Sequence, residues 1–374
     1  MPLRFFSRRT RSVPEGSVTD GSLPVRKGRR RVLRFFAILM LVLLGLVVVS
    51  TAANVLLERV ERANAIPYGE RVRIDQGTIN VSISGDSGPM LVLLSGLGTA
   101  APGLDFAPLV RALPGYRTVV VEGFGYGYSD TDVRPRTIEN IAEELHSVLS
   151  ALGIHGPYAL AGHSIGGFTT LYYANKYPAE VSAVIGIDPT VPTATTARPG
   201  APAPADAPPS GNFWERLPST LGLVRWAAAL GLLDPDGSGY TPSEITQMRM
   251  LTSWNFGNAA VTDETSRVGE NAAKLQGLSY PSRIPVLMLL SQDTLNSRPE
   301  WVDLHERQLT QVTRHELVVL DGPHYLHWTQ AKAMAEKIDE FLAPVAGSTD
   351  SMTAQRGGVV RAEALRLSGL RPAG

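Results

Sequence analysis

The residues with the clearest potential for chemistry lie in the stretch "YALAGHSIGGFTTLYYA", residues 158–174. The pentapeptide "GHSIG" matches the pattern G-x-S-x-G, with Ser164 at its centre. An apolar run typical of a buried strand precedes it, and a helical pattern follows it. A sharp strand-to-helix turn lifts a serine hydroxyl above the sheet and aims backbone N–H groups at developing negative charge. Ser164 is therefore a candidate nucleophile, although short glycine–serine patterns also occur by chance.

Two later loops contain side chains that would activate this serine, which is a weak nucleophile until a base removes its proton. The segment "LMLLSQDTLN" places Asp293 just after an apolar strand pattern, and "LDGPHYLHW" places His324 just after the next one. Both positions belong to the carboxyl ends of strands, where open α/β sheets bind ligands. The order Ser, Asp, His favours a triad in which His324 takes the serine proton and Asp293 orients the imidazole.

Other residues compete for these roles. Asp188 in "IGIDPT" ends the preceding strand pattern and is the alternative acid. We prefer Asp293, because it follows the strand immediately before the one that leads to the histidine. His327 competes with His324, but His324 directly follows Gly-Pro, so His327 is assigned a supporting position. His163, beside the nucleophile, is interpreted as structural.

Strand and helix patterns alternate along most of the chain. "RVRID" and "TINVSIS" flank "QG" and predict a hairpin. Apolar runs predict six further strands, and helical patterns lie between most of them. The strands are expected at 90–95, 117–122, 158–162, 181–188, 285–291 and 315–321, and the helices at 137–152 (capped by Thr137), 164–176, 300–311 and 328–342. This order predicts an α/β fold with a mostly parallel, eight-stranded sheet covered by helices on both faces.

One long segment after the sixth strand lacks strand patterns. It begins with a Pro/Ala-rich linker and continues as short helices that carry three of the five tryptophans. An insertion at one edge of a sheet is a candidate lid. We therefore expect residues 69–188 and 277–346 to form the core, 189–276 to form a mobile linker and helical cap, and 347–374 to be a disordered tail.

Within this insertion, "DPDGSGYTPSE" at 234–244 resembles a calcium-binding loop. Ile245 stands where the last carboxylate of such a loop would fall, which argues against calcium. The stretch instead predicts a turn followed by a helix whose N-cap is Thr241 or Ser243.

The N-terminus combines a basic segment with an apolar one. Residues 1–34 contain ten Lys or Arg and two acidic residues, and residues 35–57 contain no charge. About 20 apolar residues cross a bilayer core, and excess positive charge marks the cytoplasmic flank. We expect a disordered cytoplasmic segment at 1–34, a transmembrane signal anchor at 35–57, and a stalk at 58–68 leading to an extracytoplasmic body. The alternative is a secreted protein whose signal peptide is cleaved near "ANA" at 63–65, although the apolar run exceeds a typical signal sequence.

Composition narrows the possible chemistry further. The chain has 374 residues, of which 44% are hydrophobic, enough for one large α/β domain. It has no cysteine, which excludes disulfides, thiolate catalysis and thiolate metal sites. The basic N-terminus precedes an apolar run, which favours membrane lipid over nucleic acid as its partner.

Taken together, these motifs resemble the α/β-hydrolase family over about residues 70–342. "SGLG" at 95–98 follows the third strand, where the family often has His-Gly-x, and Ser95 departs from that histidine. "EGFGYGYSD" is similar to the family's D-x-x-G-x-G-x-S loop, with Glu122 in place of Asp. "GPHYLHW" is similar to the family's terminal Gly-x-His-aromatic-x-His.

The resemblance implies a serine hydrolase that works through an acyl-enzyme on Ser164. It also implies an oxyanion hole made by the backbone N–H groups of Leu97 and Ile165. An ester is the expected small-molecule substrate, and amide, lactone, thioester and carbon–carbon bond cleavage fit the same triad. No cofactor or metal is implied. An acyltransferase, or an inactive hydrolase fold that binds partners at the membrane, are the alternatives.

A dinucleotide-binding oxidoreductase is a weaker alternative. "SGLGTAA" after a strand also resembles G-x-G-x-x-A, and Glu122 ends the next strand. The first helix of such a fold must begin at the glycines, and Pro102 and Gly103 interrupt it here.

Overall fold

The computed structural model of the chain describes residues 25–193, 196, 212–237 and 239–343. Two compact units are distinguished, one ending at Val49 and one beginning at Ser50. Most of the predicted cytoplasmic segment, most of the Pro/Ala-rich linker and the predicted tail lie outside the described residues.

A single long helix, α1 (Val25–Asn64), begins the described chain. Its part Arg29–Asn64 is long and apolar enough to cross a membrane. This length and composition confirm an apolar N-terminal helix. A membrane anchor and a signal sequence share these properties.

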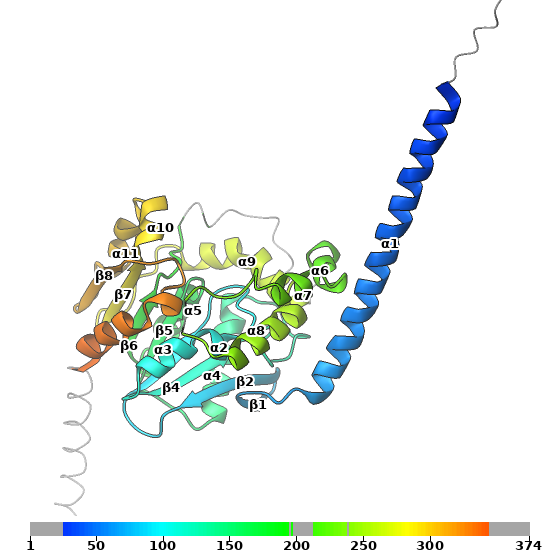
Figure 1. The fold of residues 1–374 in the computed structure, drawn as a ribbon. Helices are drawn as coiled ribbons and strands as arrows, with labels where there is room; N and C mark the ends of the chain where they lie inside the picture. The colour runs from blue at the N-terminus through cyan, green and yellow to red at the C-terminus, as the bar shows by residue number, and fades with distance from the viewer. Residues whose placement is uncertain (1–24, 194–195, 197–211, 238, 344–374) are drawn as a thin grey trace, which may run out of the picture. The chain divides into compact units, whose positions relative to one another are not determined.

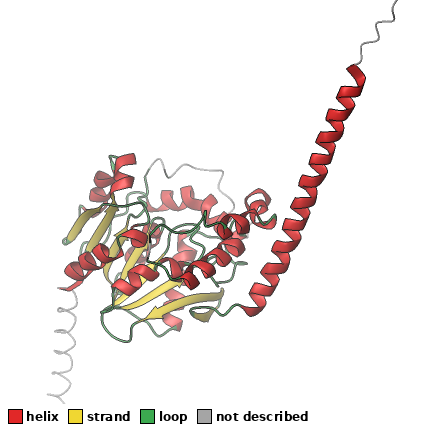
Figure 2. Cartoon of the chain, in the orientation of Figure 1, coloured by secondary structure: helices red, strands yellow, loops and turns green. Residues whose placement is uncertain are grey.

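An eight-stranded sheet with the order β1-β2-β4-β3-β5-β6-β7-β8 forms the centre of the second unit (Figures 1 and 2). The strands are β1 (Glu70–Ile74), β2 (Gly77–Ser84), β3 (Met90–Leu94), β4 (Arg117–Glu122), β5 (Tyr158–His163), β6 (Val181–Ile187), β7 (Val286–Ser291) and β8 (His315–Leu320). The first two strands form the predicted hairpin, and β2 pairs antiparallel with β4. All other neighbours are parallel. The residues that follow β3, β5, β6, β7 and β8 therefore meet at one edge of the sheet.

Helices cover both faces of this sheet, as predicted. They are α2 (Pro102–Asp105), α3 (Ala107–Ala112), α4 (Ile138–Ala151), α5 (Gly166–Lys176), α10 (Gln292–Ser297), α11 (Trp301–Leu309), α12 (Leu326–Thr329) and a helical stretch at 331–343. Side chains of β3 alternate between two cores: Leu91 and Leu93 pack with α3, and Val92 and Leu94 pack with α4 and α5. This alternation follows from the two-residue period of a strand. The predicted cap of α4 is confirmed, because the Thr137 side chain accepts a hydrogen bond from Asn140 N.

Four helices are present in the described residues between β6 and β7, where the cap was expected. They are α6 (Phe213–Thr220), α7 (Leu223–Ala229), α8 (Pro242–Asn255) and α9 (Ala259–Leu275). Thr241 and Glu244 form a reciprocal capping box at the start of α8, which confirms the predicted N-cap at Thr241.

The last inserted helix belongs to the core of the body. Ala260, Ala272 and Leu275 of α9 are buried in the same hydrophobic cluster as residues of α4 and α5. Ahead of α9, Asn258 donates through Nδ2 to Gly125 O over 2.7 Å, which ties this end of the helix to the loop after β4.

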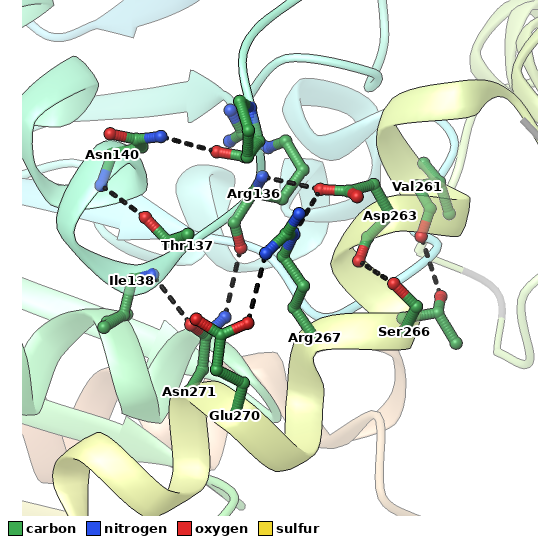
Figure 3. Close-up of polar contacts among 12 residues, drawn as sticks. Arg136, Thr137, Ile138, Asn140, Val261, Asp263, Ser266, Arg267, Glu270 and Asn271 are labelled. Atoms are coloured by element: carbon green, nitrogen blue, oxygen red, sulfur yellow. Dashed lines mark hydrogen bonds and ion pairs between the residues drawn. The ribbon is translucent and has the colours of Figure 1, made fainter. Parts of the chain in front are cut away.

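Buried polar contacts attach the middle of α9 to the chain just before α4 (Figure 3). Asp263 accepts hydrogen bonds from the backbone N of Arg136, at 2.7 Å, and from Nε of Arg267, at 2.9 Å. Asn271 accepts from Ile138 N at 2.9 Å and donates to Arg136 O at 3.1 Å. We therefore use the word cap below for α6–α8 only.

Candidate active site

Ser164 lies on the turn between β5 and α5, and its φ of 52° is a left-handed value that few non-glycine residues adopt. The flanking glycines permit this turn. A Cβ on Gly162 would lie 2.7 Å from the backbone oxygen of Gly166, closer than real contacts allow. The backbone oxygen of Ser164 accepts from Gly167 N at 2.9 Å and from Thr190 N at 2.7 Å. These bonds hold the strained turn that a nucleophile elbow requires.

The "SGLG" loop after β3 lies directly against this turn. A Cβ on Gly96 would lie 3.1 Å from Ser164 Cβ and 2.8 Å from His163 Nδ1, so glycine is needed there for close approach. Among the described residues, the N–H groups of Leu97 and Ile165 have no hydrogen-bond partner. Two unpaired backbone donors beside a serine are available to an oxyanion.

Tyr126 supports the candidate oxyanion loop through hydrogen bonds of its hydroxyl group. Its hydroxyl accepts from Gly98 N at 3.3 Å and donates to Glu264 Oε2 at 2.9 Å. Burial raises the pKa of Glu264, although the nearby charge of Arg136 acts in the opposite direction. Sequence analysis did not identify Tyr126 as a site residue. Its place in the glycine-rich loop after β4 was the available signal.

His324 follows β8, and its Nδ1 lies 2.6 Å from Oδ2 of Asp188. The imidazole is partly exposed, whereas the Asp188 side chain is completely buried. A carboxylate at Nδ1 leaves Nε2 free to accept a proton and favours the imidazolium that results.

Three further donors fix the Asp188 carboxylate. Trp301 Nε1 donates to Oδ1 at 2.7 Å, Ser291 N donates to Oδ1 at 3.1 Å, and Thr294 Oγ1 donates to Oδ2 at 2.5 Å. Burial alone would raise the pKa of Asp188, but the hydrogen bonds from His324 and these three donors hold it below its ordinary value. The carboxylate is therefore ionised at neutral pH.

The prediction that Asp293 is the acid partner of His324 is wrong in this structure. Asp293 lies in the first turn of α10 and is exposed, and no hydrogen bond joins its carboxylate to the described residues. Asp188, the alternative considered from sequence, occupies the position. Its φ of 40° marks a tight turn after β6, and its carboxylate accepts a bond from the last residue of β7.

The two other histidines have supporting positions, as expected. His163 is buried, and its Nε2 donates to the backbone oxygen of His324 over 3.2 Å. Burial, followed by the neighbouring His327 and His324, lowers the pKa of His163 well below its usual range, so it is neutral. Nε2 of His327 lies 2.7 Å from Oδ2 of buried Asp105.

Glu122, in the "EGFGYGYSD" loop, is completely buried and organises its surroundings. Its carboxylate accepts from Asn80 Nδ2 at 2.9 Å, Gly103 N at 3.1 Å and Tyr128 N at 2.9 Å, and also from the Tyr68 hydroxyl. Glu122 is thus inaccessible to a ribose. The helix that follows the "SGLG" loop, α2, begins only at Pro102, beyond the glycines. Both findings contradict the dinucleotide-binding alternative.

A cavity of about 160 Å³ lies between the cap and two loops of the site. The body contributes Gly98 of the "SGLG" loop, the following Thr99, and Tyr325 next to His324, and the cap contributes Ala228 and Leu233. A smaller cavity of about 60 Å³ touches Ser95 and Ile165 and ends at Glu264 and Arg136. The cavity of about 160 Å³ therefore adjoins both the "SGLG" loop and the loop that carries His324.

The sheet order, the strand–turn–helix at Ser164 and the inserted helices after β6 are those of an α/β hydrolase. The family model of the alpha/beta hydrolase fold matches residues 89–331, and the chain belongs to this family. Its relatives include the uncharacterized protein YbdG of Bacillus subtilis strain 168, which is 27% identical over 81% of this chain and 98% of that protein.

Solved structures share the fold at low sequence identity. Cfl2 from Burkholderia cenocepacia has a TM-score of 0.56 and 20% identity, covering 73% of this chain and 94% of that one. The enol-lactonase from Burkholderia xenovorans LB400 has a TM-score of 0.52 and 19% identity, covering 73% of this chain and all of that one. At this identity the likeness concerns the fold alone.

Proposed function

We propose that this protein is a serine hydrolase that cleaves carboxylic esters through Ser164, His324 and Asp188. One observation carries the proposal. The only carboxylate bonded to His324 among the described residues is buried, ionised and 2.6 Å from Nδ1, at the sheet edge where the strained Ser164 turn lies. A serine, a histidine and an ionised aspartate at one edge are the parts that acyl transfer requires.

In this mechanism Ser164 Oγ attacks the ester carbonyl while His324 Nε2 accepts its proton. The N–H groups of Leu97 and Ile165 stabilise the negative charge on the carbonyl oxygen. His324 then returns the proton to the departing alcohol, leaving an acyl group on Ser164. Water, deprotonated by His324, releases the acid and restores the serine. Asp188 holds the imidazole orientation and stabilises its charged form throughout.

Amides, lactones and thioesters are cleaved by the same sequence of steps, and an alcohol acceptor in place of water would give acyl transfer. The cavity between the cap and the two site loops favours an ester with an apolar portion, because Ala101, Ala228 and Leu233 form part of its wall. We assign the choice of substrate to the cap and the chemistry to the body.

We further propose that α1 is a retained membrane anchor, with residues 1–34 in the cytoplasm and the hydrolase body outside. The contacts of Arg225 in α7 support retention. Its Nε donates to Asn54 Oδ1 at 2.7 Å, and its two terminal nitrogens lie 2.6 and 2.9 Å from the Glu61 carboxylate. Cleavage at 63–65 would remove both partners and leave a largely buried guanidinium unpaired, which is costly.

A fluorophosphonate probe, which modifies activated serines, tests the catalytic proposal. The full chain should be labelled at Ser164 and should hydrolyse short-chain esters. Ser164→Ala should abolish labelling and lower turnover by several orders of magnitude. Ser297→Ala, at an exposed serine of α10, is the matched control and should change neither. Labelling that persists in Ser164→Ala would contradict the proposal.

A further inference from the structure

The C-terminal part of α1 is bonded to the cap. Ser50 Oγ donates to Leu221 O at 2.6 Å and accepts from Trp226 Nε1 at 2.7 Å. Asn54, which is buried, donates through Nδ2 to Ser219 O at 3.0 Å. Ser50 and Asn54 are one turn apart, so one face of the helix carries these bonds. The junction of α6 and α7 therefore rests on this face of α1.

These contacts lie where the apolar run would leave a bilayer. About 20 helical residues cross a hydrocarbon core, and a span that starts at Phe35 ends near Asn54. Residues 50–54 of α1 would thus be at the membrane–water boundary. The parts of the cap bonded to Ser50 and Asn54 must lie at the same level.

The same part of the cap exposes large apolar side chains. The exposed large apolar residues between 213 and 233 are Phe213, Trp214, Leu223, Trp226, Leu230, Leu232 and Leu233; we refer to these seven residues as the cap face. The exposed fraction is 73% for Trp214 and 75% for Leu230, so most of each residue is in contact with solvent. After α1, other exposed large apolar residues in the described part of the chain occur singly, at Ile66, Ile83, Phe256, Leu278 and Val319.

Helix α7 shows that this exposure is not a consequence of loose packing. Val224 and Ala228 on one side are buried, while Leu223, Trp226 and Leu230, spaced by three and four residues, are exposed on another. A short helix with one apolar side buried and a second apolar side uncovered has a further surface to cover. Tryptophan, phenylalanine and leucine are the residues that place a protein surface in the boundary layer of a membrane.

We propose that the cap face and the end of α1 form one membrane-contacting surface, and that the candidate site draws ester lipids from the bilayer. The proposal rests on the anchor and hydrolase functions proposed above. Leu233 belongs to the cap face and also lines the cavity beside Gly98 and Tyr325. An acyl chain that leaves the bilayer at the cap face would therefore reach the cavity next to the oxyanion and histidine loops.

The absence of cysteine from the sequence allows each position to be labelled alone. Leu230→Cys and Leu232→Cys would each carry a spin label on the full chain in phosphatidylcholine/phosphatidylglycerol liposomes. We expect collisions with apolar oxygen to exceed those with a water-soluble nickel chelate. Val319→Cys, an exposed apolar position on β8, is the matched control and should favour the nickel chelate. The proposal would be overturned if labels at Leu230 and Leu232 collided with the two reagents as the label at Val319 does. It would also be overturned if both labels were shielded from both reagents, as they would be under a second copy of the protein.

Turnover supplies an independent measurement. The double variant Leu230→Glu/Leu232→Glu should hydrolyse a long-chain ester embedded in the liposomes at least about 10-fold more slowly, because charged side chains are disfavoured in the boundary layer. Hydrolysis of a soluble short-chain ester should be unchanged, since neither leucine lines the cavity. Val319→Glu should affect neither substrate. Equal loss on both substrates, or no loss on either, would contradict the membrane surface. A wild-type chain inactive on both esters would contradict the hydrolase proposal, while the spin labels would still test the surface.

Discussion

The carboxylate of Asp188 is bonded to His324 across the end of an intervening strand. Asp188 follows β6 and His324 follows β8, and β7 lies between these strands. Oδ2 of Asp188 is 2.6 Å from Nδ1 of His324, and Oδ1 accepts from the backbone N of Ser291, the last residue of β7. The carboxylate therefore lies over the end of β7. This explains how an acid two strands away from the histidine can orient it.

The first prediction compares the two aspartates. Asp188→Asn should lower turnover of a soluble ester by roughly 10³ to 10⁴, because the imidazole loses the partner that fixes its tautomer. Asp293→Asn removes an exposed carboxylate with no bond to the histidine and should change turnover less than about twofold. Steady-state kinetics on both purified variants is the measurement. A larger loss in Asp293→Asn would restore the original sequence-based assignment.

A second prediction concerns pH and stability. Hydrogen bonds hold the pKa of Asp188 in the folded protein below its value in the unfolded chain. The ionised carboxylate therefore stabilises the fold at pH values above the unfolded pKa. This stabilisation is lost as the pH falls through the folded pKa. Thr294→Val removes one donor to the carboxylate and should raise its folded pKa. The variant should be less stable at pH 7 by about 1.5 kcal/mol.

Urea unfolding between neutral and strongly acidic pH measures this difference. The free energy of unfolding of Thr294→Val should differ from that of the wild type by an amount that depends on pH. The pH-dependent part of this difference should disappear once Asp188 is protonated in both folded proteins. Thr310→Val, at an exposed threonine after α11, should show no such pH dependence. A gap of constant size down to the most acidic condition would show that Thr294 does not act through the charge of Asp188.

Much of the fold followed from local sequence patterns. Continuous apolar runs such as those at 90–95 and 285–291 predicted buried parallel strands, because such strands are covered on both faces. The strained turn at Ser164 was predictable because glycines on both sides of a serine, at a strand-to-helix junction, have a physical cause in the turn itself. The position of His324 was predictable because it follows an apolar run that forms β8, at the sheet edge where the residues after the parallel strands meet.

The carboxylate that is bonded to His324 was not predictable in the same way. Asp188 and Asp293 both follow buried strands, and local patterns do not show which side chain turns inward. That choice depends on a left-handed turn at Asp188 and on donors from Thr294 and Trp301, far away in sequence. The bonds of Asn54 and Glu61 to the cap were equally hidden, because they join residues more than 160 positions apart.

The third prediction tests Tyr126 as a positioning residue. Tyr126→Phe removes the acceptor of Gly98 N and the donor to Glu264, which should loosen the loop that carries Leu97. We expect kcat to fall by about 10-fold with KM nearly unchanged, because the loop stabilises charge that develops only in the transition state. Tyr128→Phe is the control, since the buried Tyr128 hydroxyl has no hydrogen-bond partner among the described residues. Equal effects of the two substitutions would show that Tyr126 contributes packing only.

A fourth prediction concerns α9 as part of the body. Asp263→Ala removes one of the two carboxylates that pair with Arg267, the other being Glu270, and the acceptor of the Arg136 backbone N (Figure 3). Asp263, Arg267 and Arg136 are all buried. Loss of one member of a buried pair should cost about 3 kcal/mol of unfolding free energy. Thr265→Ala, on an exposed side of the same helix, should cost far less. Thermal and urea unfolding give both values, and an unchanged stability of Asp263→Ala would mean that α9 is not fixed by these contacts.

The last prediction is that the mature protein keeps α1 and remains in the membrane. Arg225 is held by Asn54 and Glu61, so removal of residues before about 65 would strip the cap of both partners. The intact mass of protein extracted from membranes should therefore include residues 35–64.

The orientation of the anchor is tested separately. A reporter active only outside the cytoplasm, fused after residue 343, should be active, because ten basic residues precede the apolar run. Glu61→Gln should keep residues 35–64 in the mature protein but loosen the cap, which would be seen as faster proteolysis within the cap helices. Glu58→Gln, on the same helix and bonded to Arg62, should not loosen it. A mature N-terminus near Asn64 to Ile66 would instead establish a cleaved signal sequence, and a stronger signal from a cytoplasmic reporter would reverse the orientation.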